Sequence, residues 1–142
     1  MVALPFQILR EEIPEVPQDQ EGVGLVAKLT YGESITKGDI LYFKSDGKVY
    51  KADANGSSTY PAMALALATA SSGSNYVLLH GIYRDDALYN LTVGGAVYLS
   101  TTAGAATQTQ PSAANDVVQV IGIALHADRL YFNPSADYMT HV

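Results

Sequence analysis

The fold is decided by a segment that occurs twice: residues 35–43 are Ile-Thr-Lys-Gly-Asp-Ile-Leu-Tyr-Phe, and residues 91–99 are Leu-Thr-Val-Gly-Gly-Ala-Val-Tyr-Leu, at an offset of 56 residues. Gly47 matches Gly104 at an offset of 57, and Met63-Ala-Leu-Ala-Leu67 matches Ile121-Gly-Ile-Ala-Leu125 at an offset of 58. Three matches in the same order, with one residue gained in each loop, predict two diverged copies of one structural unit.

Residues 62–68, Ala-Met-Ala-Leu-Ala-Leu-Ala, fit two kinds of secondary structure. Ala and Leu are good helix formers, but Met63, Leu65 and Leu67 alternate strictly with alanine, which is the period of a strand. The repeat decides between the two, because the matching residues 120–125 are rich in β-branched side chains. We therefore expect a strand at 62–68 whose alanine side packs closely against a second layer.

The chain from Val23 onward shows strand signals separated by turns. Asp46-Gly47, between strand-forming runs at 39–44 and 48–52, is typical of a type I′ hairpin, which needs positive φ at both central positions. Further strands are expected at 24–31, 75–83, 96–100, 105–109, 117–125 and 129–132. The sequence predicts an all-β fold, a small barrel or sandwich of about nine short strands, made from two pseudo-repeats at about 24–80 and 81–134. Neither copy alone offers much core, so we expect both copies together to close one barrel.

Residues 1–23 differ in composition and are expected to form an extended N-terminal arm before a single β domain at 24–142. Pro5, Pro14 and Pro17 interrupt any helix. Residues 1–24 carry five acids against Arg10, a net charge of −4 out of −6 for the whole chain. A disordered tail is the alternative interpretation. The apolar side chains of the arm are the candidate partner-binding residues: Phe6, Ile8, Leu9, Ile13 and Val16.

Composition narrows the possible classes of protein. Only 15% of the 142 residues are charged, which is low for a globular domain and favours a surface partly covered by a partner. The absence of cysteine excludes disulfides and thiolate metal sites. No apolar run approaches the roughly 20 residues that span a bilayer, and an acidic chain without a basic stripe is a poor nucleic-acid binder. We expect neither membrane nor nucleic acid as a partner.

No motif predicts a reaction. His80, His126 and His141 lack the spacing of metal ligands. Asp85-Asp86 beside Arg84 is interpreted as a polar turn with a local arginine contact, because neighbouring strand residues point to opposite faces. No serine lies in a nucleophile elbow and no glycine motif cradles phosphate. We therefore expect a protein that is not an enzyme, with no catalytic, metal-binding or cofactor-binding residues and no cofactor.

Four segments, residues 38–43, 46–53, 91–99 and 120–125, give the chain a resemblance to small β proteins of phage virions, which decorate heads or form domains of tail fibres and spikes. The resemblance covers about residues 23–134. It implies a head decoration protein, made in the host cytoplasm and located on the capsid surface of the virion. Such proteins are homotrimers that bind the major capsid protein and clamp neighbouring subunits.

The resemblance leaves a second function open, a receptor- or glycan-binding domain of a tail fibre or spike. Recognition would then be carried by the loops at 53–61 and 102–116. The chain lacks the long repetitive or coiled-coil shaft of a fibre protein, and this favours decoration.

Overall fold

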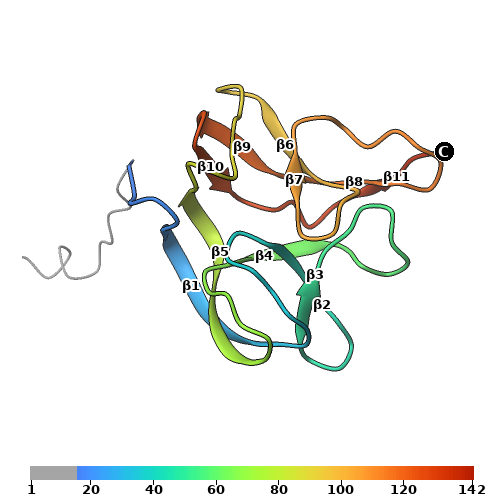
Figure 1. Cartoon of the computed structure of the whole chain (residues 1–142). Helices are drawn as coiled ribbons and strands as arrows, with labels where there is room; N and C mark the ends of the chain where they lie inside the picture. Colours follow the sequence, from blue (N-terminus) through green and yellow to red (C-terminus); the bar gives the residue numbers. More distant parts are fainter. Residues whose placement is uncertain (1–15) are drawn as a thin grey trace, which may run out of the picture.

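The computed structural model describes residues 16–142, which form eleven strands and no helix (Figure 1). The all-β prediction is confirmed, including a strand within 62–68. The predicted strand at 117–125 is divided in two at Gln119, and the last strand has no counterpart among the predicted ones. The strands are β1 Gly22–Tyr31, β2 Ile40–Phe43, β3 Val49–Lys51, β4 Ala62–Ala66, β5 Gly73–Arg84, β6 Ala96–Leu99, β7 Ala106–Thr107, β8 Val117–Val118, β9 Val120–His126, β10 Arg129–Phe132 and β11 Met139–Thr140.

The first unit closes into a barrel without help from the second. The main sheet has the order β1-β3-β2-β4-β5-β10-β9-β6-β7, and β1 also pairs with β5, which closes β1 to β5 into a ring. The expectation that two copies close one barrel is therefore wrong. The ring closes because β1 pairs along its length with β5 while its last residue, Tyr31, reaches Val49 of β3. In the second unit the sheet simply extends outward from β5 and ends at β7 (Figure 1).

The two units repeat the same strand register. In the first, Leu41 of β2 pairs with Ala64 of β4; in the second, Val97 of β6 pairs with Gly122 of β9. These are the same positions at the offsets of 56 and 58 seen in the sequence. In both ladders a register shift follows immediately after this pair. The correspondence includes an irregularity of the pairing, so it reflects one supersecondary unit used twice.

The bend before each unit's first hairpin strand is also shared. Gly38 has φ +94° and Gly94 has φ +80°, a backbone region that glycine enters without steric cost. The Gly38 amide donates to the Ala66 carbonyl at 2.8 Å, and the Gly94 amide donates to the Ala124 carbonyl at 2.8 Å. Each bend is thus hydrogen-bonded to the small-residue strand of its own unit.

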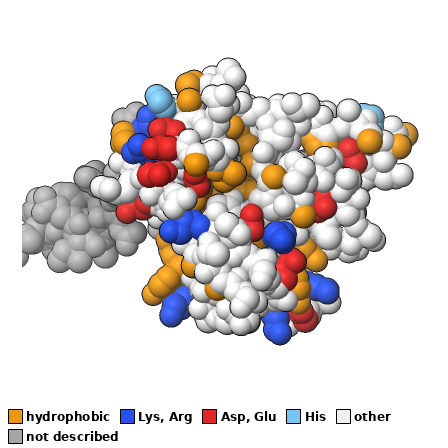
Figure 2. Space-filling model, in the orientation of Figure 1, with side chains coloured by type: hydrophobic (Ala, Val, Ile, Leu, Met, Phe, Trp, Pro, Cys, Tyr) orange, Lys and Arg blue, Asp and Glu red, His pale blue; other side chains and the backbone are white. Residues whose placement is uncertain are grey.

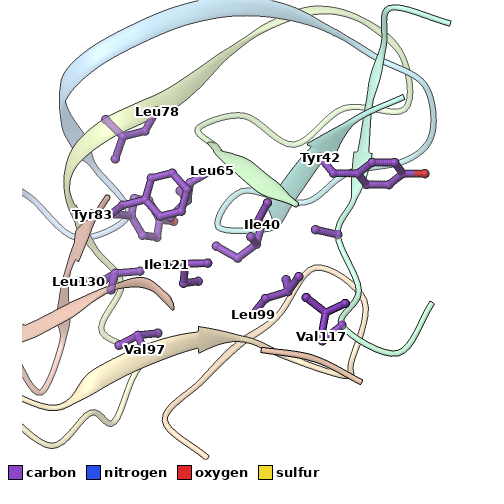
Figure 3. Packing of buried hydrophobic residues seen from close by; sticks show 14 of the residues in the cluster. Ile40, Tyr42, Leu65, Leu78, Tyr83, Val97, Leu99, Val117, Ile121 and Leu130 are labelled. Atoms are coloured by element: carbon purple, nitrogen blue, oxygen red, sulfur yellow. The ribbon is translucent and has the colours of Figure 1, made fainter. Parts of the chain in front are cut away.

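Two hydrophobic clusters result from this arrangement. The alanine side of β4, with Ala64 and Ala66, lies inside the barrel, where small side chains suit its narrow interior. The first unit consequently has a core of its own, made of Tyr31, Ile35, Leu41, Val49, Ala64, Ala66 and Val77. The larger cluster lies between the units, where side chains from both converge (Figure 3): Ile40, Tyr42, Leu65, Leu78, Tyr83, Val97, Leu99, Val117, Ile121 and Leu130.

Glycines allow the strands of the second unit to lie close together. Phe132 of β10 is directly paired with Gly81 of β5 on one side and Gly122 of β9 on the other. A Cβ on Gly81 would collide with the Val23 carbonyl oxygen, and one on Gly122 would collide with that of Tyr131. Backbone atoms leave no room to adjust, so these positions require glycine. Phe132 is fully buried between them.

Candidate interaction surfaces

The segment that leads into β1 is tied to the far end of β5. The Arg84 guanidinium donates from Nη1 to the Pro17 carbonyl at 3.0 Å, and the Arg84 amide donates to the Glu21 carbonyl at 3.1 Å. The Asp86 amide donates to Asp19 Oδ1 at 2.8 Å. Pro17 is buried. The chain therefore enters the β body at a fixed point, which we call the arm base, residues 17–21.

Of the candidate arm residues, only Val16 can be located. Its side chain is 58% exposed and lies next to the arm base. The other four lie outside the described residues: Phe6, Ile8, Leu9 and Ile13.

Ion pairs surround the arm base. Arg84 Nε and Nη2 donate to the two carboxylate oxygens of Asp86 at 2.8 and 3.0 Å, and this bond raises the pKa of Arg84. Asp128 contacts His126 at 3.0 Å and Arg129 at 3.1 Å. Desolvation opposes the charged form of Asp128, but the hydrogen bonds and charge interactions with His126 and Arg129 together outweigh it, so the pKa of Asp128 is lowered. These ion pairs hold the turn after β5 in place.

The Asp85-Asp86 pair forms a polar turn, as predicted. Asp85 Oδ1 accepts hydrogen bonds from the amides of Ala87 and Leu88 at 3.2 and 2.9 Å. The Tyr83 hydroxyl donates to Asp85 Oδ2 at 3.1 Å. Burial and this carboxylate raise the pKa of Tyr83 far above its ordinary value. Asp85 therefore caps the turn, while Asp86 pairs with arginine, so the two carboxylates serve separate structural contacts.

The histidines are dispersed. His80 on β5 contacts the Tyr131 hydroxyl through Nε2 at 2.6 Å, and its ring lies 5.3 Å from the Tyr131 ring. His126 pairs with Asp128, and the His141 amide donates to the Asp116 carbonyl. Within residues 16–142, no group of three or more His, Cys, Asp or Glu side chains could hold a metal ion.

The loops at 53–61 and 102–116 meet at one end of the molecule. The Tyr60 and Tyr138 rings pack edge to face with centroids 5.2 Å apart. The Asn115 amide donates to the His141 carbonyl at 2.8 Å, and the His141 amide donates to the Asp116 carbonyl at 2.7 Å. Both loops are thereby joined to the C-terminal segment. This loop end lies opposite the arm base (Figure 1).

A shallow apolar groove lies at the loop end. Its volume is about 260 Å³, and it is lined by Val118, Val120, Ser135, Asp137, Tyr138 and Met139. Tyr138 is 43% exposed and Met139 is 73% exposed. Charged side chains are sparse around this end on the face drawn in Figure 2. An exposed aromatic ring beside a carboxylate and a hydroxyl is chemistry that suits a polar ligand with an apolar face.

No protein-family model matches the chain, and no curated protein matches it. The described residues include no helix that is long and apolar enough to cross a membrane.

A small cavity lies at the junction of the two units. It measures about 180 Å³ and includes Asp39 and Gly104 in its wall. Asp39 Oδ2 accepts a hydrogen bond from the Thr36 amide at 2.8 Å and so caps the bend of the first unit. Desolvation raises the pKa of Asp39 despite this bond.

The β2–β3 hairpin has a mixed-charge surface. Lys44, Asp46 and Lys48 are all exposed. The Tyr50 hydroxyl donates to Asp46, and Lys44 Nζ lies 4.8 Å from the centre of the Tyr50 ring. Figure 2 shows acidic and basic side chains interspersed over this part of the molecule. Such a surface is solvated and discourages pairing between sheet edges.

Proposed function

We propose that this protein is a structural component of a phage virion that binds the outside of the capsid and stabilises it. Its partner is the major capsid protein, which it contacts as a homotrimer on the virion surface. Binding, without a catalytic step, is the whole activity. The proposal rests on the sequence resemblance, on the closed β body and on the position of the arm base.

The observation that carries the proposal is the attachment of the arm base to the end of β5. Arg84 holds the Pro17 carbonyl and the Asp86 amide holds Asp19, so the arm base is fixed to the β body. Fifteen extended residues can span roughly 50 Å. That reach is enough to extend from one protein onto a neighbouring capsid subunit.

The chemistry of residues 1–15 suits such a contact. Apolar side chains at four positions would fill pockets on the partner, while the backbone could add to the edge of its sheet. Residues 1–15 carry Arg10 against Glu11, Glu12 and Glu15, a net charge of −2, which favours a basic stretch of the capsid subunit. Because exposed charges are screened by salt, binding should weaken as the ionic strength rises.

The direct test uses heads that lack the protein. Full-length protein, and protein without residues 1–15, are mixed with these heads, and the bound fraction is measured by co-sedimentation. A third variant replaces Phe6, Ile8, Leu9 and Ile13 with serine, which keeps the length and charge of the arm. Each buried apolar side chain contributes about 1.5 kcal/mol or more, so we expect both altered proteins to bind at least about 100-fold more weakly.

Circular dichroism and thermal melts establish that the altered proteins remain folded. The matched control is Lys48→Ser on the exposed hairpin, which should bind like the unaltered protein. Undiminished head occupancy by the protein without residues 1–15 would contradict the role given to the arm. Absence of binding by the full-length protein would contradict the function itself.

A second candidate function is favoured by the loop end. Tyr60 of the loop 53–61 packs against Tyr138 of the C-terminal segment, and backbone bonds of Asn115 and Asp116 to His141 join the loop 102–116 to the same segment. These are the two loops that a receptor- or glycan-binding tail domain would use, and the groove beside Tyr138 offers an exposed aromatic ring. A glycan array separates the two functions. Saturable binding that is lost in Tyr138→Ala would favour the tail domain, whereas a decoration protein should give no signal.

A further inference from the structure

Two places in the sequence put a glycine directly after a side chain that can cyclise onto the backbone, Asn55-Gly56 and Asp46-Gly47. In such a pair, the amide nitrogen of the glycine attacks Cγ of the preceding side chain and forms a five-membered succinimide. Glycine favours this reaction because it has no Cβ to obstruct the approach and because its backbone is the most flexible. The hydrogen bonds of the folded chain decide which of the two pairs is able to react.

The Asn55-Gly56 pair has both reacting groups free. It lies in the loop 53–61, and the Asn55 side chain is exposed. Within residues 16–142, the Asn55 side chain makes no hydrogen bond and the Gly56 amide donates none. The Asn55 backbone amide alone is held, by donation to Asp53 Oδ1 at 3.0 Å. Neither the side-chain amide nor the attacking nitrogen has to leave a partner before the ring forms.

The loop around this pair is fixed at its ends and free at its tip. The Asp53 amide donates to the Thr59 carbonyl at 3.0 Å, and the Thr59 hydroxyl donates to the Asp53 carbonyl at 2.7 Å. Residues 56–58, in contrast, form no hydrogen bond to any other part of the described chain. The backbone at the tip can therefore adjust toward the ring geometry while the rest of the protein stays folded.

The Asp46-Gly47 pair has related chemistry, but both of its groups are held. The Gly47 amide donates to the Lys44 carbonyl at 3.0 Å. The Asp46 carboxylate accepts from the Tyr50 hydroxyl and, at 2.9 Å, from the Lys48 amide. The Tyr50 bond is the main cause that lowers the pKa of Asp46, which keeps the carboxylate in its less reactive charged form. The turn must open before this pair can cyclise.

The other four asparagines are protected as well. The side-chain amide of Asn75 donates to two backbone carbonyls, at 3.1 and 3.0 Å. The backbone amides that follow Asn90 and Asn115 donate to carbonyls at 2.9 and 3.1 Å. Asn133 precedes a proline, which has no N–H to attack with. Asn55 is therefore the asparagine at which sequence and hydrogen bonding both favour the reaction.

We propose that Asn55 is a site of spontaneous deamidation in the folded protein, in keeping with the thermal lability of asparagine. The Gly56 nitrogen forms a bond to Cγ of Asn55, its proton passes through solvent to Nδ2, and Nδ2 leaves as ammonia. Water then opens the succinimide at one of its two carbonyls and leaves aspartate or isoaspartate at position 55. The loop 53–61 gains one negative charge, and the isoaspartate product also lengthens its backbone by one methylene.

The test is a time course of the full chain at mildly alkaline pH, followed by peptide mapping with mass spectrometry. Position 55 should be modified at least about tenfold faster than any other asparagine, because the others must first leave a hydrogen bond or lack the attacking N–H. Asp46 should yield no isoaspartate while the chain is folded. Asn55→Gln, whose longer side chain closes a ring more slowly, should remove the modification at this position, and circular dichroism confirms that the variant is folded.

The same time course in urea removes the protection that folding provides. Asp46 should then form isoaspartate, whereas the rate at Asn55 should change little, because its groups are already free in the folded chain. An Asn55 that reacts in urea but stays intact in the folded chain would overturn the proposal. So would deamidation of Asn75, Asn90 or Asn115 at the rate of Asn55, or isomerisation of Asp46 at equal rates with and without urea.

Discussion

Replacing Gln119 with methionine should destabilise the protein strongly, because this one side chain joins the two units. Gln119 is 1% exposed and follows β8. Its Oε1 accepts from the Ala62 amide at 2.8 Å, and its Nε2 donates to the carbonyls of Ala62 and Ser135 at 2.9 and 2.8 Å. The side chain thus binds β4 of the first unit and the segment after β10 at once. Methionine matches its length but can make none of these bonds.

The cost follows from the number of bonds and their burial. Three intramolecular hydrogen bonds at about 1 kcal/mol each give about 3 kcal/mol. The Ala62 amide, left buried without an acceptor, adds about 1–2 kcal/mol. We expect the free energy of unfolding to fall by about 3–5 kcal/mol, a large part of the 5–15 kcal/mol typical of a domain. The melting temperature should fall by about 10 °C or more.

The chain offers a matched control for this experiment. Gln108 makes the same pair of bonds, to the amide and carbonyl of Thr92 at 2.8 and 2.9 Å, in contact with solvent. Gln108→Met should cost only about 1 kcal/mol, because water can replace the lost partner. Urea unfolding followed by circular dichroism measures both variants. Equal losses for Gln119→Met and Gln108→Met would refute the reasoning that burial sets the cost.

The other two stability predictions concern a glycine and a carboxylate. Gly122→Ala should lower the free energy of unfolding by about 3 kcal/mol or more, because the new Cβ would collide with the Tyr131 carbonyl. Gly22→Ala is the control and should cost about 1 kcal/mol, because its Cβ first meets the movable side chain of Leu67. Equal urea midpoints for the two variants would contradict this prediction. Asp39 has a raised pKa in the folded state, so its charge opposes folding at neutral pH and this effect disappears as the pH falls through that pKa. Asp39→Asn should therefore raise the melting temperature at pH 7 and change it little in acid. Thermal melts of both proteins across the pH range measure this, and a variant that is less stable than the unaltered protein at pH 7 would contradict the reasoning.

The sequence repeat predicts the strands well because matching residues of the two copies occupy matching positions in the strand pairs. The segment 62–68 has helical propensity, but its match to 120–125 predicts the strand β4 correctly, and the identical register of Leu41–Ala64 and Val97–Gly122 explains why the match exists. The closure of the first unit could not be predicted, because it depends on long-range pairing of β1 with both β5 and β3. The interruption between β8 and β9 at Gln119 could not be predicted, because the residues on either side are apolar. The three hydrogen bonds of the Gln119 side chain explain why a polar residue is buried at this position.

The interaction surfaces were predicted in part. The sequence names the loops at 53–61 and 102–116 as candidates, but it does not show that both contact the C-terminal segment, the first through Tyr60 and Tyr138 and the second through Asn115 and His141. Residues 120–125 are apolar without alternation, which is typical of a strand covered on both sides. Ile123 points outward in that run and Ala124 points inward.

Electron cryomicroscopy of heads incubated with the full-length protein tests the central claim most directly, since that claim is attachment to a capsid surface. The proposal predicts added density on the outside of the shell at regular positions between capsid subunits, sized for copies of this 15.1 kDa chain, with an extended segment running from the arm base onto a neighbouring subunit. Shells that remain bare at saturating protein, under conditions where the protein is folded, would contradict it.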